Sequence, residues 1–178
     1  LMFDKIKDHA QGFRALFGHF ASPKRIALTL GVDEEFDHVL AFTRMYHEKM
    51  KYCAPLTMAE VKSGLAQENA EEDNDINLFD FPAPLLHEKD GGRYIGTGHL
   101  VITKDPNSDW INVGTYRIML QDEKTAGIYI GPGKYAYIHK QKYFEKNYPM
   151  PVNVVLGSDP LDWFAASCPV PAGISEFD

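Results

Sequence analysis

The residues whose types and spacing could do chemistry are densest between Asp90 and Arg117. Two consecutive glycines, Gly91 and Gly92, precede a β-rich run, and Gly96-Thr97-Gly98 places two more inside it. Glycine inside a strand usually marks a bulge or a close approach of a ligand, so a flat ring could lie against this backbone. The pattern is not a dinucleotide fingerprint, because no third glycine opens a helix. A bulged hairpin without a ligand is the simpler alternative.

The run Asn112-Val113-Gly114-Thr115-Tyr116-Arg117 adds polar side chains to a second β pattern. Alternation along a strand puts Asn112, Gly114 and Tyr116 on one face and Arg117 on the other, unless a bulge intervenes. The guanidinium of Arg117 could bind a carboxylate through two hydrogen bonds, or it could lie on a solvated face. The residues alone leave both interpretations open.

A possible phosphate site lies at Gly131-Pro132-Gly133-Lys134, between an expected strand and an expected helix. Free backbone N–H groups, a helix N-terminus and an ammonium group can together bind a phosphate. The spacing is not that of a P-loop, so a plain connecting turn is the alternative. Glu176 could be a metal ligand or an ordinary surface acid.

The elements that must position these residues can be read from caps and periodicity. Ser22 before Pro23 predicts the start of a helix that Gly31 ends, and Thr57 with Glu60 has the form of a capping box. We expect helices over 23–30, 33–51, 57–67, 134–146 and 159–167. We expect strands over 94–103, 110–120, 126–130 and 151–156, the first two forming a long hairpin and the last one buried. Helices followed by an antiparallel meander and a β-α unit predict an α+β architecture.

Composition excludes several classes of protein. Lys and Arg number 18 against 25 Asp and Glu, and no basic run could follow a phosphate backbone, so we expect no nucleic-acid partner. No stretch approaches 18 apolar residues, so we expect no membrane span. Cys53 and Cys168 stand outside any pairing motif, which fits a reducing cytoplasm. A small anionic ligand remains compatible with the net charge of −7.

Taken together, four ordered motifs strongly resemble the UbiD family of decarboxylases. They are Asp90–Thr97, Ile102–Pro106, Asn112–Arg117 and Val170–Asp178. Members of this family use prenylated FMN to add or remove carboxylate on aromatic and α,β-unsaturated acids. The resemblance implies an N-terminal helical α/β segment over 1–89 and, over 90–178, a flavin-reductase-like split β-barrel that is incomplete in this chain.

The resemblance also implies roles for individual residues. Asn112 and Glu176 would be oxygen ligands of Mn²⁺ or Mg²⁺, hard ions that also bind the cofactor phosphate, and K⁺ is a further implied ion. Lys134 stands where some members have a histidine ligand, so it could meet the phosphate directly. Arg117 matches the family arginine that works beside the reacting carboxylate and the cofactor. The remaining residues expected to line the flavin are Thr97, Val113, Gly114, Thr115, Ser167, Cys168 and Pro169.

Members of the family are much longer than this chain, which starts at Leu1 and stops at Asp178. We therefore expect part of a longer protein, or a subunit completed by another chain, and a homo-oligomer is a further expectation. The acidic residues that complete the family's Glu-Arg-Glu network have no match here, so the general acid that protonates the product lies elsewhere. The leading hypothesis is the cofactor-binding part of a carboxy-lyase for a small aromatic or conjugated acid. The alternatives are a non-catalytic flavin- or phosphate-binding module, an inactive fragment and, with less support, a flavin reductase.

Overall fold

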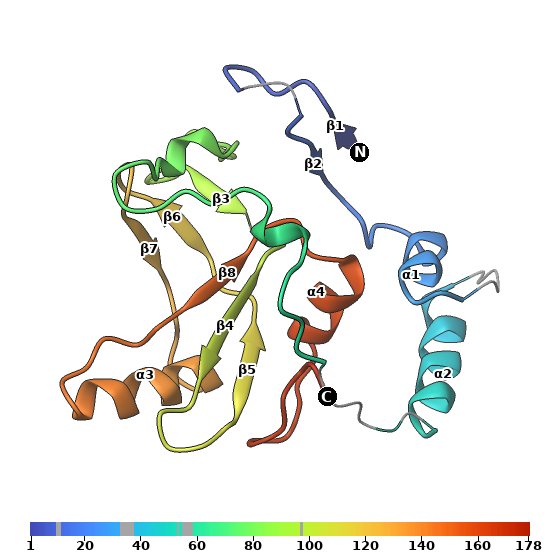
Figure 1. Cartoon of the computed structure of the whole chain (residues 1–178). Coiled ribbons are helices and arrows are strands. Elements are labelled where there is room, and N and C mark those ends of the chain that lie inside the picture. Colours follow the sequence, from blue (N-terminus) through green and yellow to red (C-terminus); the bar gives the residue numbers. More distant parts are fainter. Residues whose placement is uncertain (10–11, 33–37, 53, 55–58, 97) are drawn as a thin grey trace. The chain divides into compact units, whose positions relative to one another are not determined.

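The computed structural model describes residues 1–9, 12–32, 38–52, 54, 59–96 and 98–178 (Figure 1). Several predicted features fall outside these residues: Thr97, Cys53, Thr57 of the capping box, and the acidic start of the second helix at 33–35. The chain forms two compact units. The N-terminal unit comprises residues 1–56 and 159–161, and the C-terminal unit comprises residues 57–158 and 162–178.

The N-terminal unit contains a short antiparallel pair and two helices. Strand β1 (Met2–Phe3) pairs with β2 (Ala15–Leu16). Helix α1 (Pro23–Thr29) begins as predicted, because the Ser22 side chain accepts a hydrogen bond from the Arg25 amide and Pro23 occupies the first turn. Helix α2 (Val39–Met50) begins where His38 Nδ1 accepts from the Leu40 amide at 3.2 Å.

The predicted third helix over 57–67 is wrong in its described part. Residues 59–64 are not helical, and only the 3₁₀ turn η1 (Leu65–Gln67) forms, followed by η2 (Leu78–Asp80). Val61 and Leu65 have the spacing of one helical face, but both are exposed, so no packing stabilises a helix here. A capping box alone does not provide that stabilisation.

Two three-stranded antiparallel sheets build the C-terminal unit. One has the order β3-β6-β7, made of β3 (Tyr94–Gly96), β6 (Ile118–Leu120) and β7 (Ala126–Ile128). The other has the order β5-β4-β8, made of β5 (Ile111–Gly114), β4 (Leu100–Lys104) and β8 (Asn153–Val155). Within the described residues these sheets do not close into a barrel.

The long hairpin predicted over 94–120 is therefore only partly correct. Its tip is β4 paired with β5, in the register Val101↔Gly114 to Lys104↔Ile111. Its two arms then leave this sheet and pair again as β3 and β6 in the other. Each predicted strand is thus two short strands in different sheets, and Gly96, with φ of +148°, takes a backbone conformation that side chains rarely adopt.

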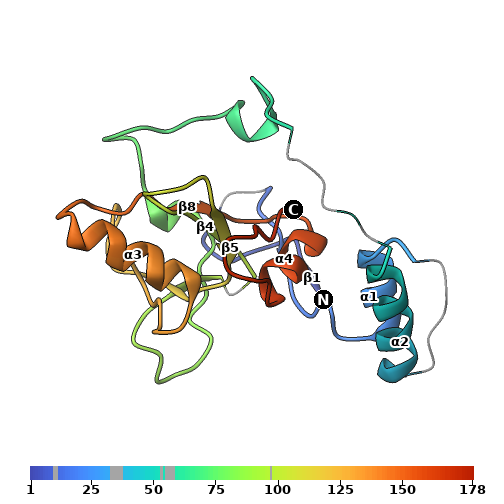
Figure 2. The ribbon, with the colours of Figure 1, turned by 90° about the horizontal axis from the view of Figure 1, so that it is seen from below.

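Two helices cover opposite faces of the β5-β4-β8 sheet, as Figure 2 shows. Helix α3 (Tyr135–Glu145) packs Ala136 against Val101, and α4 (Pro160–Ser167) packs Ala166 against Leu100. Consecutive residues of β4 therefore point to different helices, as strand alternation requires. Both helices agree with their predicted ranges.

Strand β8 differs from the prediction of a buried strand, because all three of its residues are exposed. Among the described residues β8 pairs only with β4, so it lies at the edge of its sheet. Its apolar composition is typical of burial, but no described segment covers its side chains. No helix in the described part of the chain is long and apolar enough to cross a membrane.

Candidate functional site

A cavity of about 410 Å³ lies in the C-terminal unit where β5, the start of α3, the end of α4 and the C-terminal segment meet. Nine residues that the sequence singled out line it: Asn112, Val113, Gly114, Thr115, Lys134, Ser167, Cys168, Pro169 and Glu176. They come from four stretches spread over more than 60 positions of sequence. The fold therefore brings together residues that the sequence could group only by resemblance.

The C-terminal segment is fixed to the cavity by three hydrogen bonds. Glu176 Oε2 accepts from the Val113 amide at 2.7 Å. Trp110 Nε1 donates to the Ile174 carbonyl at 3.1 Å, and the Tyr135 hydroxyl donates to the Val170 carbonyl at 2.8 Å. Burial raises the pKa of Glu176, although the hydrogen bond from Val113 acts in the opposite direction.

Asn112 and Tyr116 form the buried wall of the cavity. The Asn112 side chain is 2% exposed, and its Nδ2 donates to Thr103 Oγ1 at 3.5 Å. Burial raises the pKa of Tyr116, while hydrogen bonds to its hydroxyl from the Asn112 side chain and the Ala136 amide lower it. A Cβ added to Gly114 would lie 2.7 Å from the Tyr116 ring, so only glycine leaves room for that ring.

The predicted phosphate loop lies between β7 and α3, with Gly133 in a left-handed conformation at φ of +84°. Lys134 is the N-cap residue of α3, and its side chain makes no capping hydrogen bond. Lys134 is exposed and borders the cavity, so a basic group and the first amides of a helix face the same space.

Arg117 does not line this cavity. It is exposed and borders a second cavity of about 350 Å³ in the same unit, together with Tyr94, Met119 and Tyr129. Residues 115–117 form the crossover between the two sheets, so neighbouring residues of the motif face different spaces. Strand alternation places Arg117 on the opposite face from Asn112, Gly114 and Tyr116, and the two cavities separate them in this way, although β5 ends at Gly114 and alternation does not extend beyond it.

Asn112 and Glu176 supply an amide group and a carboxylate to one cavity, a donor set that suits a hard divalent cation. Within the described ranges no three His, Cys, Asp or Glu residues come together as a metal cluster. These two residues could therefore hold only part of a coordination shell, with the remaining ligands coming from a phosphate or water. Tyr135 was missed by the sequence reasoning; its place directly after Lys134 was the available signal.

Comparison with known proteins agrees with the resemblance. Residues 58–178 match the family model described as UbiD, 3-octaprenyl-4-hydroxybenzoate carboxy-lyase Rift-related domain. The pyrrole-2-carboxylic acid decarboxylase of Pseudomonas aeruginosa is 30% identical over 98% of this chain and 36% of its own length. The vanillic acid decarboxylase of Sedimentibacter hydroxybenzoicus, in closed form, superimposes with a TM-score of 0.85 at 30% identity, covering 98% of this chain and 37% of that one.

A third comparison concerns a cofactor complex. An evolved dimeric form of the UbiD-class enzyme HmfF from Pelotomaculum thermopropionicum, solved with prenylated FMN, gives a TM-score of 0.55 at 26% identity over 58% of this chain and 24% of that one. The present chain spans little more than a third of the length of the curated relatives that it matches. The family model covers more than half of the chain, and the chain belongs to the UbiD family.

Proposed function

We propose that this chain provides the cofactor-binding part of a prenylated-FMN-dependent carboxy-lyase that acts reversibly on an aromatic or α,β-unsaturated carboxylic acid. The observation that carries the proposal is the shared cavity: the nine residues named above line one space of about 410 Å³. Two similar proteins are named for the decarboxylation of small aromatic acids, and a third was solved with prenylated FMN.

The residues of the cavity suit the parts of such a cofactor. Asn112 and Glu176 would hold a divalent Mn²⁺ or Mg²⁺ ion through oxygen atoms, and Lys134 with the α3 N-terminus would bind the phosphate. Val113, Gly114 and Thr115 would lie along the flavin, and Ser167, Cys168 and Pro169 would lie opposite them. Thr97 is proposed as a further residue along the flavin on the resemblance alone. A K⁺ ion is likewise proposed on the resemblance alone.

When bound, prenylated FMN would supply the electron sink for the pair released as CO₂ leaves. The part of this chain is to bind and orient. Arg117 would hold the substrate carboxylate beside the cofactor, and its place by the aromatic residues Tyr94 and Tyr129 suits a conjugated acid. The proton that replaces CO₂ would come from an acid outside this chain.

Binding of FMN and Mn²⁺ to the whole chain tests the proposal. We expect flavin fluorescence to be quenched on binding, more strongly with Mn²⁺ present. Glu176→Gln should weaken Mn²⁺-dependent flavin binding by about tenfold or more, because it removes a charged ligand. Glu123→Gln is the matched control, since Glu123 is exposed and lies outside the cavity. Equal binding by both variants would remove Glu176 from the metal site.

A second candidate is a non-catalytic flavin- or phosphate-binding module. The separation of Arg117 from the main cavity favours it, because the proposed catalytic group does not share a space with the proposed ligands. Decarboxylation or carboxylate isotope exchange by the chain would exclude this candidate. For the whole protein we also propose a completed split barrel, a homo-oligomer or a partner chain, and a cytoplasmic location.

A further inference from the structure

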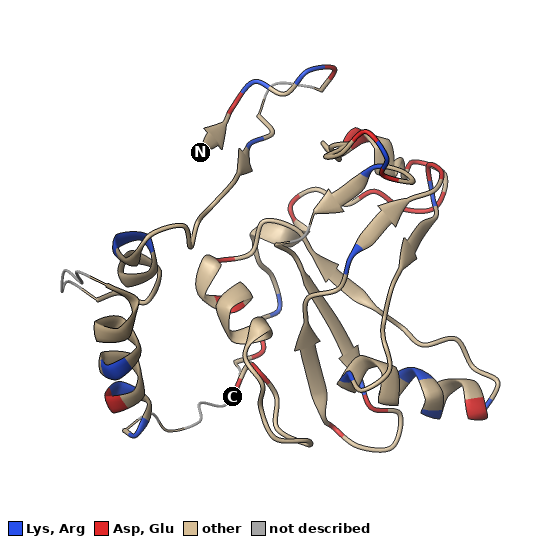
Figure 3. Cartoon of the chain, turned by 180° about the vertical axis from the view of Figure 1, so that it is seen from behind, with Lys and Arg blue, Asp and Glu red and all other residues tan. Residues whose placement is uncertain are grey.

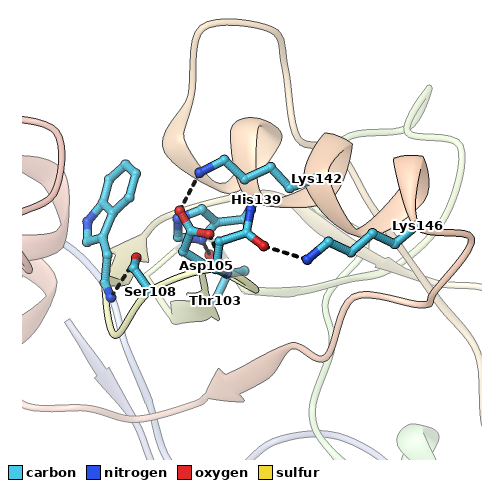
Figure 4. Close-up of polar contacts among 8 residues, drawn as sticks. Thr103, Asp105, Ser108, His139, Lys142 and Lys146 are labelled. Carbon is cyan, nitrogen blue, oxygen red and sulfur yellow. Dashed lines mark hydrogen bonds and ion pairs between the residues drawn. The ribbon is translucent and has the colours of Figure 1, made fainter.

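A line of buried polar side chains runs behind the cavity, from β5 through β4 to α3. Asn112 on β5 is 2% exposed, Thr103 on β4 is 1% exposed, and His139 on α3 is fully buried. Figure 4 shows the Thr103 and His139 side chains directed toward one another. Of the three residues only Asn112 reaches the cavity.

The strand register explains why these groups meet. Thr103 and Asn112 are directly paired across β4 and β5, so their side chains project from the same face of the sheet. The Asn112 Nδ2 to Thr103 Oγ1 distance is 3.5 Å, and the Thr103 Oγ1 to His139 Nδ1 distance is 3.0 Å. The Trp110 ring packs edge-to-face on the His139 ring at a centroid separation of 4.6 Å.

The donors and acceptors on this line are not interchangeable. An amide nitrogen can only donate, so Thr103 Oγ1 accepts from Asn112. A hydroxyl has one proton, which Thr103 can then direct to His139 Nδ1, leaving a lone pair toward Asn112. The amide nitrogen of Asn112 is thereby held on Thr103, and the amide oxygen is left for the cavity that Asn112 lines.

We propose that Thr103 and His139 are positioning residues that orient the Asn112 amide so that Oδ1 faces the cavity. The use of that oxygen as a metal ligand rests on the proposed function, but the orientation itself does not. Without the Thr103 hydroxyl, the Asn112 amide nitrogen would lose this acceptor, and rotation of the amide by 180° would present a donor to the cation.

The test follows the two side-chain amide protons of Asn112 by NMR in the whole ¹⁵N-labelled chain, assigned by their loss in Asn112→Ser. We expect two resolved, slowly exchanging signals. Thr103→Val, which keeps the shape and removes the hydroxyl, should speed their exchange by about tenfold, the effect of losing a buried hydrogen bond. His139→Phe should speed it by a smaller factor, because the hydroxyl stays but is free to rotate.

Two controls separate orientation from general loosening of the core. Thr103→Ser restores the hydroxyl and should return the exchange rate to within about twofold of the wild type. Ile102→Val on the same strand loosens packing without touching the polar line and should leave the Asn112 signals in place. Unchanged Asn112 signals in Thr103→Val would overturn the inference.

Adding Mn²⁺ then tests the proposed role of Asn112 as a metal ligand separately from the orientation of its amide. In the wild type we expect paramagnetic broadening of the Asn112 signals, and Thr103→Val should weaken the apparent Mn²⁺ affinity about tenfold, as loss of a ligand's supporting partner does. Thr103→Ser should bind like the wild type. If the wild type shows no broadening, the metal role of Asn112 fails, whereas the exchange rates still decide whether Thr103 and His139 orient the amide.

Discussion

At the scale of single residues, Gly114 shows how closely the cavity wall is packed. The Tyr116 ring occupies the space that a side chain at position 114 would need, with two ring carbons and the hydroxyl oxygen 2.7–3.0 Å from the added Cβ. We expect Gly114→Ala to displace Tyr116 and to lower the free energy of unfolding by about 1–3 kcal/mol, as overpacking does. Urea titration measures this change.

Gly64→Ala is the control for that substitution, since no heavy atom lies within 4 Å of an added Cβ there. Its unfolding midpoint should stay near that of the wild type. Equal midpoints for the two alanine variants would mean that Tyr116 can move aside at no cost, and the packing argument for Gly114 would be wrong.

Glu176 should reduce the stability of the ligand-free chain. Burial raises its pKa, so the folded chain holds this proton to higher pH than the unfolded chain does. Stability therefore falls as pH rises from the ordinary carboxyl pKa through the raised one. Glu176→Gln removes this loss, and its amide oxygen can still accept from Val113. We expect the variant to unfold at a higher urea concentration than the wild type at pH 7, with the two converging in acid.

At the scale of elements, the sequence predicted the positions of helices better than the pairing of strands. Helices α1 and α4 have local signals, Ser22 with Pro23 and Asp159 with Pro160, that act within one turn. The split of the long hairpin into two sheets has none, because β propensity is the same in either sheet and pairing is a long-range property. The motifs grouped Asn112 with Glu176, but they could not show that Arg117 faces another cavity.

The turn after β4 is tied to α3 by an ion pair between Asp105 and Lys142, and Figure 3 shows the acidic turn beside the basic positions of that helix. Burial is the largest single influence on Asp105 and opposes its ionisation, but the hydrogen bond and charge of Lys142 and the hydrogen bond from the Asn107 amide together outweigh it and lower the pKa of the carboxyl. The stabilisation is present above the ordinary carboxyl pKa and is lost as pH falls through the lowered one. We expect Asp105→Asn to cost about 1–3 kcal/mol at pH 7 and to flatten the acid dependence of stability.

Asp109→Asn provides the comparison from the same turn. Asp109 also pairs with a lysine, Lys104 at 2.7 Å, but its side chain is fully exposed, so the pair should add little to stability. Midpoints of urea unfolding, measured from pH 7 down to pH 3, should drop for Asp105→Asn and barely change for Asp109→Asn. A larger drop for Asp109→Asn than for Asp105→Asn would mean that the exposed Lys104–Asp109 pair stabilises the fold more than the pair of the buried Asp105 with Lys142.

At the scale of the whole molecule, all residues that line the proposed cofactor cavity lie in the C-terminal unit. Both clusters of buried residues around the β5-β4-β8 sheet also lie there. The predicted division into 1–89 and 90–178 rests on the change from helix-forming to strand-forming sequence, and it stays a prediction. The C-terminal compact unit begins at residue 57, apart from residues 159–161, and the family model begins at residue 58.

Each unit has buried residues of its own, so we expect calorimetry of the whole chain to resolve two unfolding transitions. In the N-terminal unit Phe42 is 8% exposed, and Phe42→Ala should lower one transition only. In the C-terminal unit Leu100 is 2% exposed, and Leu100→Ala should lower the other by an amount equivalent to about 2–5 kcal/mol. FMN with Mn²⁺ should raise only the transition that Leu100→Ala lowers, because a ligand stabilises the unit that binds it. A single transition shifted by both substitutions would show that the two units unfold together.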